Sequence, residues 1–417
     1  MSVRAIVLAI VGAALMPMAF AQDEAPAPSR AAAAVSEPAS TDDTDDSGLG
    51  GRFHGATELL AEYTDNFFRQ PNDRPRRSAT GFILKPGINY ISAAPRFRFH
   101  GGIGGAFGIY TLPGNADDYR DLHGTAGVNW LIADRHALAY NAVVRKGHDP
   151  FGTDRTANTP LENRSLDRWD QENYNLLYKY GTPRGAFDIE TRGFAIKKAY
   201  RTNRDESPTT GTRFLDYDTE GGQATLFYNY SPKTKGILDF YGAHHDYVEN
   251  PGRGGNEYRI RGGIRWLATA KTSGDARIGY VTRDFRSPTR PTFHGLDWLV
   301  SAAWSPTSYR LFVLKTGRAS VPSYNTAGFI DFKHANLEWR EEWAQRFNTR
   351  LGVGYQDSRF VGTPRDDRGY TASVRAEYLV VRSVVLFGAY DYFRRNSNDD
   401  PFDYDKNTAS LGVRVSY

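Results

Sequence analysis

The sequence finishes with Asn407-Thr408-Ala409-Ser410-Leu411-Gly412-Val413-Arg414-Val415-Ser416-Tyr417. Apolar and polar residues alternate here, as in a β-strand that has one apolar face and one wet face. A terminal strand of this kind leaves one edge unpaired, and its apolar face has no core to cover it. Both problems disappear if the strand closes a barrel in lipid. Tyr417 would then lie at the membrane interface and Arg414 in an aqueous lumen.

The same alternation recurs along the chain from Arg52 onward. In one example Phe97, Phe99 and Ile103 share a face, whereas Arg98 and His100 occupy the other. Similar segments run through 122–130, 258–266 and 370–380. Counting them predicts about 18 strands, with 16–18 as the range. The fold class that follows is all-β, a transmembrane antiparallel up-and-down β-barrel.

The connections between these segments alternate in length. The short ones are 92–95, 132–135, 181–185, 231–235, 305–308 and 381–383. The long ones are 65–77, 111–120, 147–168, 201–215, 285–295, 358–368 and 396–406. Outer-membrane barrels have short periplasmic turns and longer extracellular loops. The alternation therefore predicts an even strand number, with the N- and C-termini both periplasmic.

Composition excludes several other classes of protein. No apolar run of about 20 residues follows the N-terminal segment, so a helical membrane protein is excluded. The 52 Lys and Arg residues are interspersed with 48 Asp and Glu residues, so there is no basic arm for nucleic acid. The chain has no Cys, which excludes disulfides and Cys-ligated metals.

Residues 1–21 have the pattern of a signal peptide, because Arg4 precedes a short apolar run and Ala19-Phe20-Ala21 fits a cleavage site. An uncleaved membrane anchor is the alternative. Residues 22–51 are rich in Ala, Pro and Asp and are expected to form a disordered periplasmic arm. Such an acidic run is usually a solvated tail, and a docking segment for a periplasmic partner is the alternative. Residues 52–417 are expected to form the barrel.

Aromatic residues gather at the ends of the predicted strands. Tyr174, Tyr178 and Tyr180 precede one short turn, and Tyr228 and Tyr230 precede another. The faces opposite these residues are polar, so a second buried layer as in a β-sandwich is disfavoured. The pattern is typical of an interfacial aromatic girdle.

The sequence resembles the putative beta-barrel porin 2 family of Gram-negative outer-membrane proteins. The resemblance lies in Ala61-Glu62-Tyr63-Thr64-Asp65-Asn66-Phe67-Phe68-Arg69, in the run of strands and in Leu411-Gly412-Val413-Arg414-Val415-Ser416-Tyr417. It implies location in the cell outer membrane and an outer-membrane role in exopolysaccharide or capsule export, because members are often encoded beside the synthesis genes. It also implies lipid, lipopolysaccharide, the barrel assembly machinery and polysaccharide export proteins as partners. The terminal Tyr417 keeps the aromatic signal for assembly.

The residues expected to line the lumen carry both signs of charge. One interpretation is that they pair across strands and keep the lumen hydrated. The other is that Arg259, Arg261, Arg265 and Arg277 form a basic ladder that selects anionic solutes or acidic sugars. The predicted pore-lining set is Arg96, Arg98, Asp121, Arg259, Arg261, Arg265, Arg277, Arg350, Arg375, Glu377 and Arg414.

Aromatic residues in the lumen or the long loops could stack on sugar rings, or they could serve only in packing. These residues are Trp169, Tyr217, Tyr241 and Tyr247. The glycines of Gly101-Gly102-Ile103-Gly104-Gly105 have no following helix to receive a phosphate, so we expect them to bend the wall or leave room in the lumen.

An enzyme would need a defined site, and the sequence offers only a weak one. His100 and His123, with Asp121 and Ser92 nearby in sequence, could form a hydrolase set like that of some barrel enzymes. His244 and His245 point to opposite faces of a strand, which is poor metal geometry. The sequence therefore predicts no catalytic residue, no metal and no cofactor. The expected function is an export conduit, with a general or sugar-selective uptake porin and a barrel hydrolase as alternatives.

Overall fold

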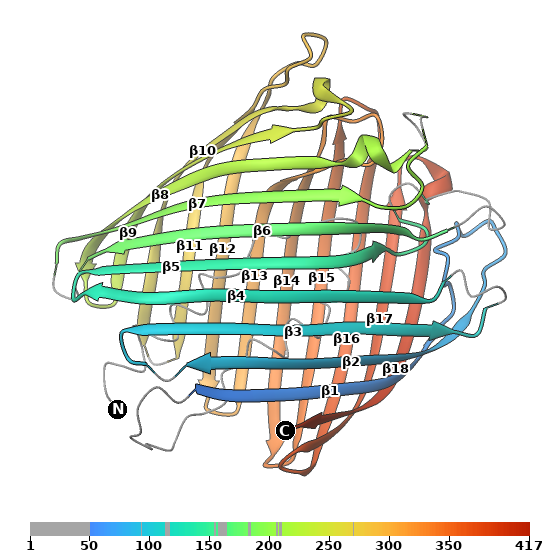
Figure 1. Cartoon of the computed structure of the whole chain (residues 1–417), viewed down its shortest axis with the longest axis horizontal. Helices are drawn as coiled ribbons and strands as arrows, with labels where there is room; N and C mark the ends of the chain where they lie inside the picture. The colour runs from blue at the N-terminus through green and yellow to red at the C-terminus, as the bar shows by residue number, and fades with distance from the viewer. Residues whose placement is uncertain are drawn as a thin grey trace.

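A computed structural model of the chain describes residues 51–92, 94–112, 117–153, 156, 165–181, 185–205, 207, 211–269 and 271–417. Within these residues the chain forms one closed antiparallel β-barrel of 18 strands (Figure 1). Each strand pairs with its neighbours in sequence, and β1 pairs with β18, so closure removes the sheet edges. The expected signal peptide and the arm up to Gly50 lie outside the described residues, and Gly51 begins β1.

The strands are β1 Gly51–Thr64, β2 Ala79–Ser92, β3 Phe97–Tyr110, β4 Tyr119–Ala133, β5 His136–Asp149, β6 Asp167–Tyr180, β7 Phe187–Tyr200, β8 Tyr217–Ser231, β9 Thr234–Asp246, β10 Gly255–Thr269, β11 Thr272–Arg283, β12 Phe293–Thr307, β13 Arg310–Val321, β14 Phe329–Ala344, β15 Phe347–Val361, β16 Asp366–Val381, β17 Val384–Ser397 and β18 Tyr404–Ser416. The 3-10 helices η3 Thr212–Leu215, η4 Pro251–Arg253 and η5 Asp400–Phe402 lie in the connections. No helix in the described part of the chain is long and apolar enough to cross a membrane.

The short turns gather at one end of the barrel and the long connections at the other. Gly51 pairs with Ser92 and Ala56 with Ser416, so the first and last strands begin and end at the short-turn end. The predicted strand number is confirmed, and most connections alternate in length as predicted. The predicted long connection 358–368 is wrong, because β15 extends to Val361 and β16 begins at Asp366. Two further long connections, which the sequence did not reveal, follow β9 and β13.

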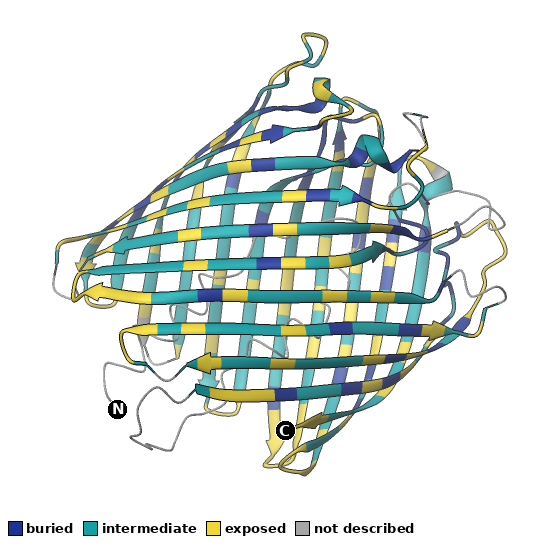
Figure 2. Cartoon of the chain, viewed as in Figure 1, coloured by how far each residue is buried: buried dark blue, intermediate teal, exposed yellow. Residues whose placement is uncertain are grey.

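Exposed residues recur between less exposed ones along the strands (Figure 2), as a wall with two different faces requires. In β18 the outward Leu411 is 70% exposed, whereas Arg414 turns inward and lies 3.4 Å from Glu377. Outward aromatic residues at the short-turn end include Tyr230 and Tyr417, which are 79% and 70% exposed. An apolar outer face with aromatic residues near its margin suits contact with lipid.

The long connections contact one another around their end of the barrel. The β1–β2 connection is fixed by Asn66, which is fully buried and donates to the carbonyls of Gln70 at 2.9 Å and Asp405 at 3.0 Å. Its next residues, Phe67 and Phe68, pack on Phe151 of the β5–β6 connection. The segment 61–69, which is part of the family resemblance, thus links the closing strand β18 to the β5–β6 connection.

Candidate functional site

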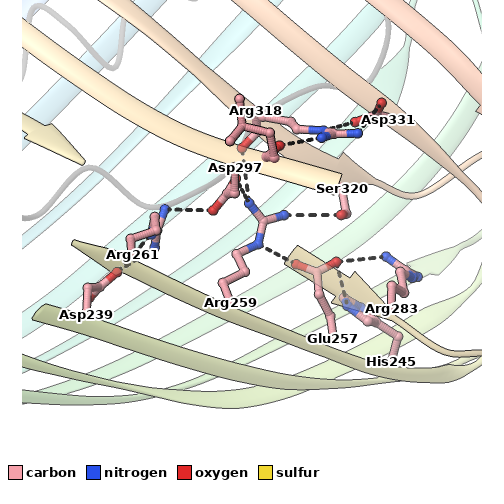
Figure 3. A network of polar contacts seen from close by, with 11 residues as sticks. Asp239, His245, Glu257, Arg259, Arg261, Arg283, Asp297, Arg318, Ser320 and Asp331 are labelled. Carbon is pink, nitrogen blue, oxygen red and sulfur yellow. Dashed lines mark hydrogen bonds and ion pairs between the residues drawn. The ribbon is translucent and has the colours of Figure 1, made fainter. Parts of the chain in front are cut away.

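The inner wall of β9–β12 carries a dense set of ion pairs, which we call the wall cluster, and Figure 3 shows the part of it around Arg259. Its centre is Arg259, whose Nε lies 2.7 Å from Glu257 and whose Nη1 lies 2.7 Å from Asp297. These three side chains are at most 5% exposed. The wall cluster comprises Asp239, Glu257, Arg259, Arg261, Arg265, Asp275, Arg277, Arg283 and Asp297.

Each arginine of the predicted basic ladder has a carboxylate partner. Arg261 lies 2.7 Å from Asp239, and Arg277 lies 3.3 Å from the same side chain. Asp275 accepts from both Arg265 and Arg277. A ladder of unpaired arginines is therefore wrong, because strand pairing brings aspartates of β9, β11 and β12 beside them. The alternative interpretation, pairing across strands, describes this wall.

The regular ladder between β12 and β13 stops before the long-loop end of the barrel. Its last pair in that direction is Leu299 with Gly317. Beyond it, β12 continues to pair with β11 as far as Phe293, and β13 continues to pair with β14 as far as Val321. The two strands thus separate while each keeps its other neighbour.

Beyond this break, β13 lies inside the wall. Arg259 Nη1 donates to the carbonyl of Arg318 at 3.1 Å, and its Nη2 donates to Ser320 Oγ at 3.1 Å (Figure 3). In a regular wall β10 and β13 would be three strand spacings apart, about 14 Å. Arg259 points inward, because its neighbour Tyr258 is exposed on the outer face. The β13 segment has therefore folded over the inner face of β10–β12.

The beginning of β14 also lies on the inner side of the wall, and the connection after β9 contacts the β13–β14 connection. Phe329 is fully buried, and its ring centroid lies 5.0 Å from that of Phe293 on β12. Arg253, in the connection after β9, is 1% exposed and donates to the carbonyl of Ser323, and burial lowers the pKa of its guanidinium. We call the segment Arg318–Phe332 the folded-in hairpin.

A second group of ion pairs spans the closure between the first and last strands. Arg375 donates to Glu377 at 2.5 Å and lies 3.6 Å from Glu58. Arg414 reaches Glu377 at 3.4 Å, and Lys85 reaches Glu58 at 3.6 Å. These side chains come from β1, β2, β16 and β18, so the pairing extends across the closing seam.

Some inward arginines have no carboxylate within 4.0 Å among the described residues. They are Arg98 on β3, Arg145 on β5, Arg192 on β7 and Arg350 on β15. Arg192 instead donates to the amide oxygen of Asn175 at 2.9 Å. Three of these four arginines lie on β3–β7, so this part of the inner wall carries positive charge without a neighbouring carboxylate among the described residues.

One predicted pore-lining residue lies elsewhere. Arg96 falls in the turn before β3, where its side chain is 69% exposed and 3.9 Å from Asp134 of another short turn. Its placement on a strand is wrong because β3 begins only at Phe97. Pro95, which precedes Arg96, has no N–H for a ladder.

The residues considered for hydrolysis are not brought together. His100 lies opposite Gly127 and His123 opposite Gly104, four register positions apart on the same strand pair, or about 13 Å. Asp121 binds His148 at 2.9 Å, and Ser92 Oγ accepts from the backbone N–H of Phe99 at 2.9 Å. In the described part of the chain, no three His, Asp or Glu residues are placed to hold a metal ion.

The candidate sugar-stacking aromatics are packed against other side chains. Trp169 donates to Asp149 at 2.7 Å, and Tyr241 stacks on Phe194 with 5.6 Å between ring centroids. Tyr217 and Tyr247 pack on each other at 5.9 Å. Glycines, by contrast, leave room on the inner wall. A Cβ on Gly104 would lie 2.6 Å from the His123 ring, so the glycine makes room for that ring on the inner wall.

Three solved structures show what this chain is similar to. The FrpB iron transporter from Neisseria meningitidis (F5-1 variant) matches at 9% identity and a TM-score of 0.46, covering 87% of this chain and 82% of that chain. A BenF-like porin from Pseudomonas fluorescens Pf-5 matches at 11% identity and a TM-score of 0.47, covering 87% and 98%. OpdQ from Pseudomonas aeruginosa matches at 11% identity and a TM-score of 0.45, covering 88% and 97%.

Comparison with curated protein sequences finds no significant match. The family comparison is decisive, because the family described as putative beta-barrel porin 2 matches residues 52–417. That range includes all but the first residue of the barrel. The chain therefore belongs to the putative beta-barrel porin 2 family and is an outer-membrane β-barrel porin.

Proposed function

We propose that this porin is a passive conduit in the export of an extracellular polysaccharide. The observation that carries the proposal is the chemistry of the inner wall. On β9–β12 the charges are paired, and on β3–β7 amides such as Asn175 and rings such as His123 line the surface. A polar wall whose charges are mostly balanced suits a hydroxyl-rich polymer, which exchanges hydrogen bonds with water and amides as it moves.

The proposal includes an orientation. We place the short turns and both termini in the periplasm and the long connections outside the cell. The support is the asymmetry in length between the two ends, because outer-membrane barrels have short periplasmic turns. The family resemblance adds the association with exopolysaccharide synthesis genes.

The test is a deletion of the gene in its own host, complemented by the unchanged gene. We expect secreted polysaccharide to fall and polymer to accumulate in the periplasm, with both restored by complementation. Complementation with the Gly388→Ala variant is a matched control, because no atom lies within 4 Å of a Cβ added there. Unchanged secretion in the deletion strain would contradict the export role.

A sugar-selective uptake porin is the second candidate, favoured by the same polar wall. It differs in direction and in the size of the solute. Swelling of liposomes that contain the purified protein, in monosaccharides and in oligosaccharides of increasing length, separates the two. Rapid swelling only with the smallest sugars, together with normal secretion in the deletion strain, would favour uptake.

A further inference from the structure

The folded-in hairpin has a reversed pattern of polar and apolar residues. In the regular half of β13 and β14, the opposed Leu314 and Leu337 face outward and are 40% and 45% exposed. Counting in steps of two from these leucines brings Arg318, Ser320 and Asp331 to the same face of the strand pair. If the wall continued straight, these polar groups would face lipid, where they are disfavoured.

The other face of the hairpin is apolar. Val321, Ile330 and Phe332 are at most 8% exposed and form a buried cluster with Phe360 of β15. In a straight wall these residues would line the aqueous lumen. The sequence of this segment therefore suits a position in which protein covers both of its faces. The other strands differ, because they have one face in water and one in lipid.

The folded-in position satisfies both faces. Arg318 pairs with Asp331 at 2.5 Å and donates to the carbonyl of Leu296, which has no ladder partner on β13. Gly295 makes room for it, because a Cβ there would lie 2.3 Å from the Arg318 guanidinium. Arg259 of β10 in turn donates a hydrogen bond to the carbonyl of Arg318. Guanidinium groups thus replace the missing ladder between β12 and β13.

We propose that the folded-in hairpin, Arg318–Phe332, is the internal constriction of this porin and sets the size limit of what passes. It occupies the lumen side of β10–β12 at the long-loop half, so it narrows the passage there. This proposal rests on the proposed conduit function only because a constriction requires a passage through the barrel. It assigns a specificity-determining element to residues that the family match does not single out.

The first test restores an outward apolar face. The triple variant Arg318→Leu, Ser320→Val, Asp331→Val removes the side-chain hydrogen bonds that join the hairpin to β10 and β12. It also makes the outer face of the hairpin apolar, which suits lipid. We expect β12 and β13 to pair further and the wall to straighten. In planar bilayers, single-channel conductance should rise, and larger uncharged polyethylene glycols should enter the pore. Arg340→Leu, in the regular half of β14, is the control and should change neither value.

A folded triple variant with the conductance and polymer limit of the unchanged protein would overturn the proposal. Folding is checked by the heat-dependent gel mobility of the barrel. Neither readout involves polysaccharide, so a failed secretion test would contradict the export role but leave the constriction proposal unaffected.

A second test does not need the triple variant to fold. Because the chain has no Cys, the pair Phe293→Cys and Phe329→Cys can be crosslinked with a short bifunctional thiol reagent. Their ring centroids lie 5.0 Å apart in the folded-in position, whereas a straight wall would put the two side chains on opposite faces. We expect crosslinking in the folded barrel and none for Phe293→Cys with Leu337→Cys, since Leu337 faces outward. A folded barrel in which the first pair does not crosslink would refute the folded-in position.

Discussion

Removal of the Arg259 side chain should destabilise the barrel more than removal of any exposed arginine. The guanidinium makes two charge pairs at 2.7 Å with carboxylates that are at most 3% exposed. Breaking a buried pair by removing one partner costs about 3–5 kcal/mol, because a charge stays buried without its counterion. Asp297 keeps Arg261 at 3.6 Å and Glu257 keeps Arg283 at 3.4 Å, so the lower end applies. We expect Arg259→Ala to lower the free energy of unfolding by about 3 kcal/mol.

The matched control is Arg340→Ala. Arg340 pairs with Glu338 on the same inner surface, but the two side chains are 40% and 32% exposed. A pair in contact with water contributes about 1 kcal/mol or less. The assay is reversible urea unfolding of the refolded barrel in lipid vesicles, followed by tryptophan fluorescence. Equal losses in the two variants would refute the claim that the wall cluster is a dry, mutually dependent set.

Three further outcomes follow from the same geometry. Gly279→Ala should prevent assembly of the folded barrel, because its Cβ would lie 1.8 Å from the carbonyl oxygen of Ile260, whereas Gly388→Ala should fold normally. Heat-dependent gel mobility measures folding of both variants, and a folded Gly279→Ala barrel would contradict the pairing of β10 with β11. The double variant Arg145→Gln, Arg192→Gln should make the channel more selective for cations, because these inward charges have no carboxylate neighbour among the described residues. The reversal potential in a salt gradient measures this selectivity, and an unchanged potential would show that the two arginines do not face the ion path. Asn66→Ala should make the β1–β2 connection sensitive to trypsin, because it removes two side-chain hydrogen bonds to backbone carbonyls, and cleavage no faster than in Asn72→Ala would count against that anchoring role.

Local sequence periodicity was sufficient to predict the barrel. In each strand the outward residues, such as Leu411 and Ile103, had to be apolar, and the inward ones had to tolerate water. Connection lengths then indicated most of the alternation between short turns and long connections, but not the long connections after β9 and β13. These features are local, so a single sequence contains them.

Pairing of the inward charges was not predictable in the same way. Arg259 and Asp297 are 38 positions apart in sequence, and only strand register puts them in contact. Register follows from the whole closed sheet, because each strand is fixed by two neighbours. A list of inward arginines therefore looked like a basic ladder until the partners on β9, β11 and β12 were placed.

The folded-in hairpin did leave a signal in the sequence. Arg318, Ser320 and Asp331 fall on the face that should be apolar, and Val321 and Ile330 fall on the face that should be polar. A segment whose alternation runs out of phase with its own strand is incompatible with a simple wall. The direction of folding still depends on Arg259 of β10 and the Leu296 carbonyl of β12, which contact the hairpin. The local sequence pattern does not identify these contacts.

Single-channel conductance in a planar lipid bilayer tests the central claim most directly. The refolded, membrane-inserted protein should show large, steady open steps that scale with salt concentration, because an 18-stranded barrel with a polar wall encloses a water-filled passage. Persistent silence from a barrel that is shown to be folded and inserted would contradict an open conduit.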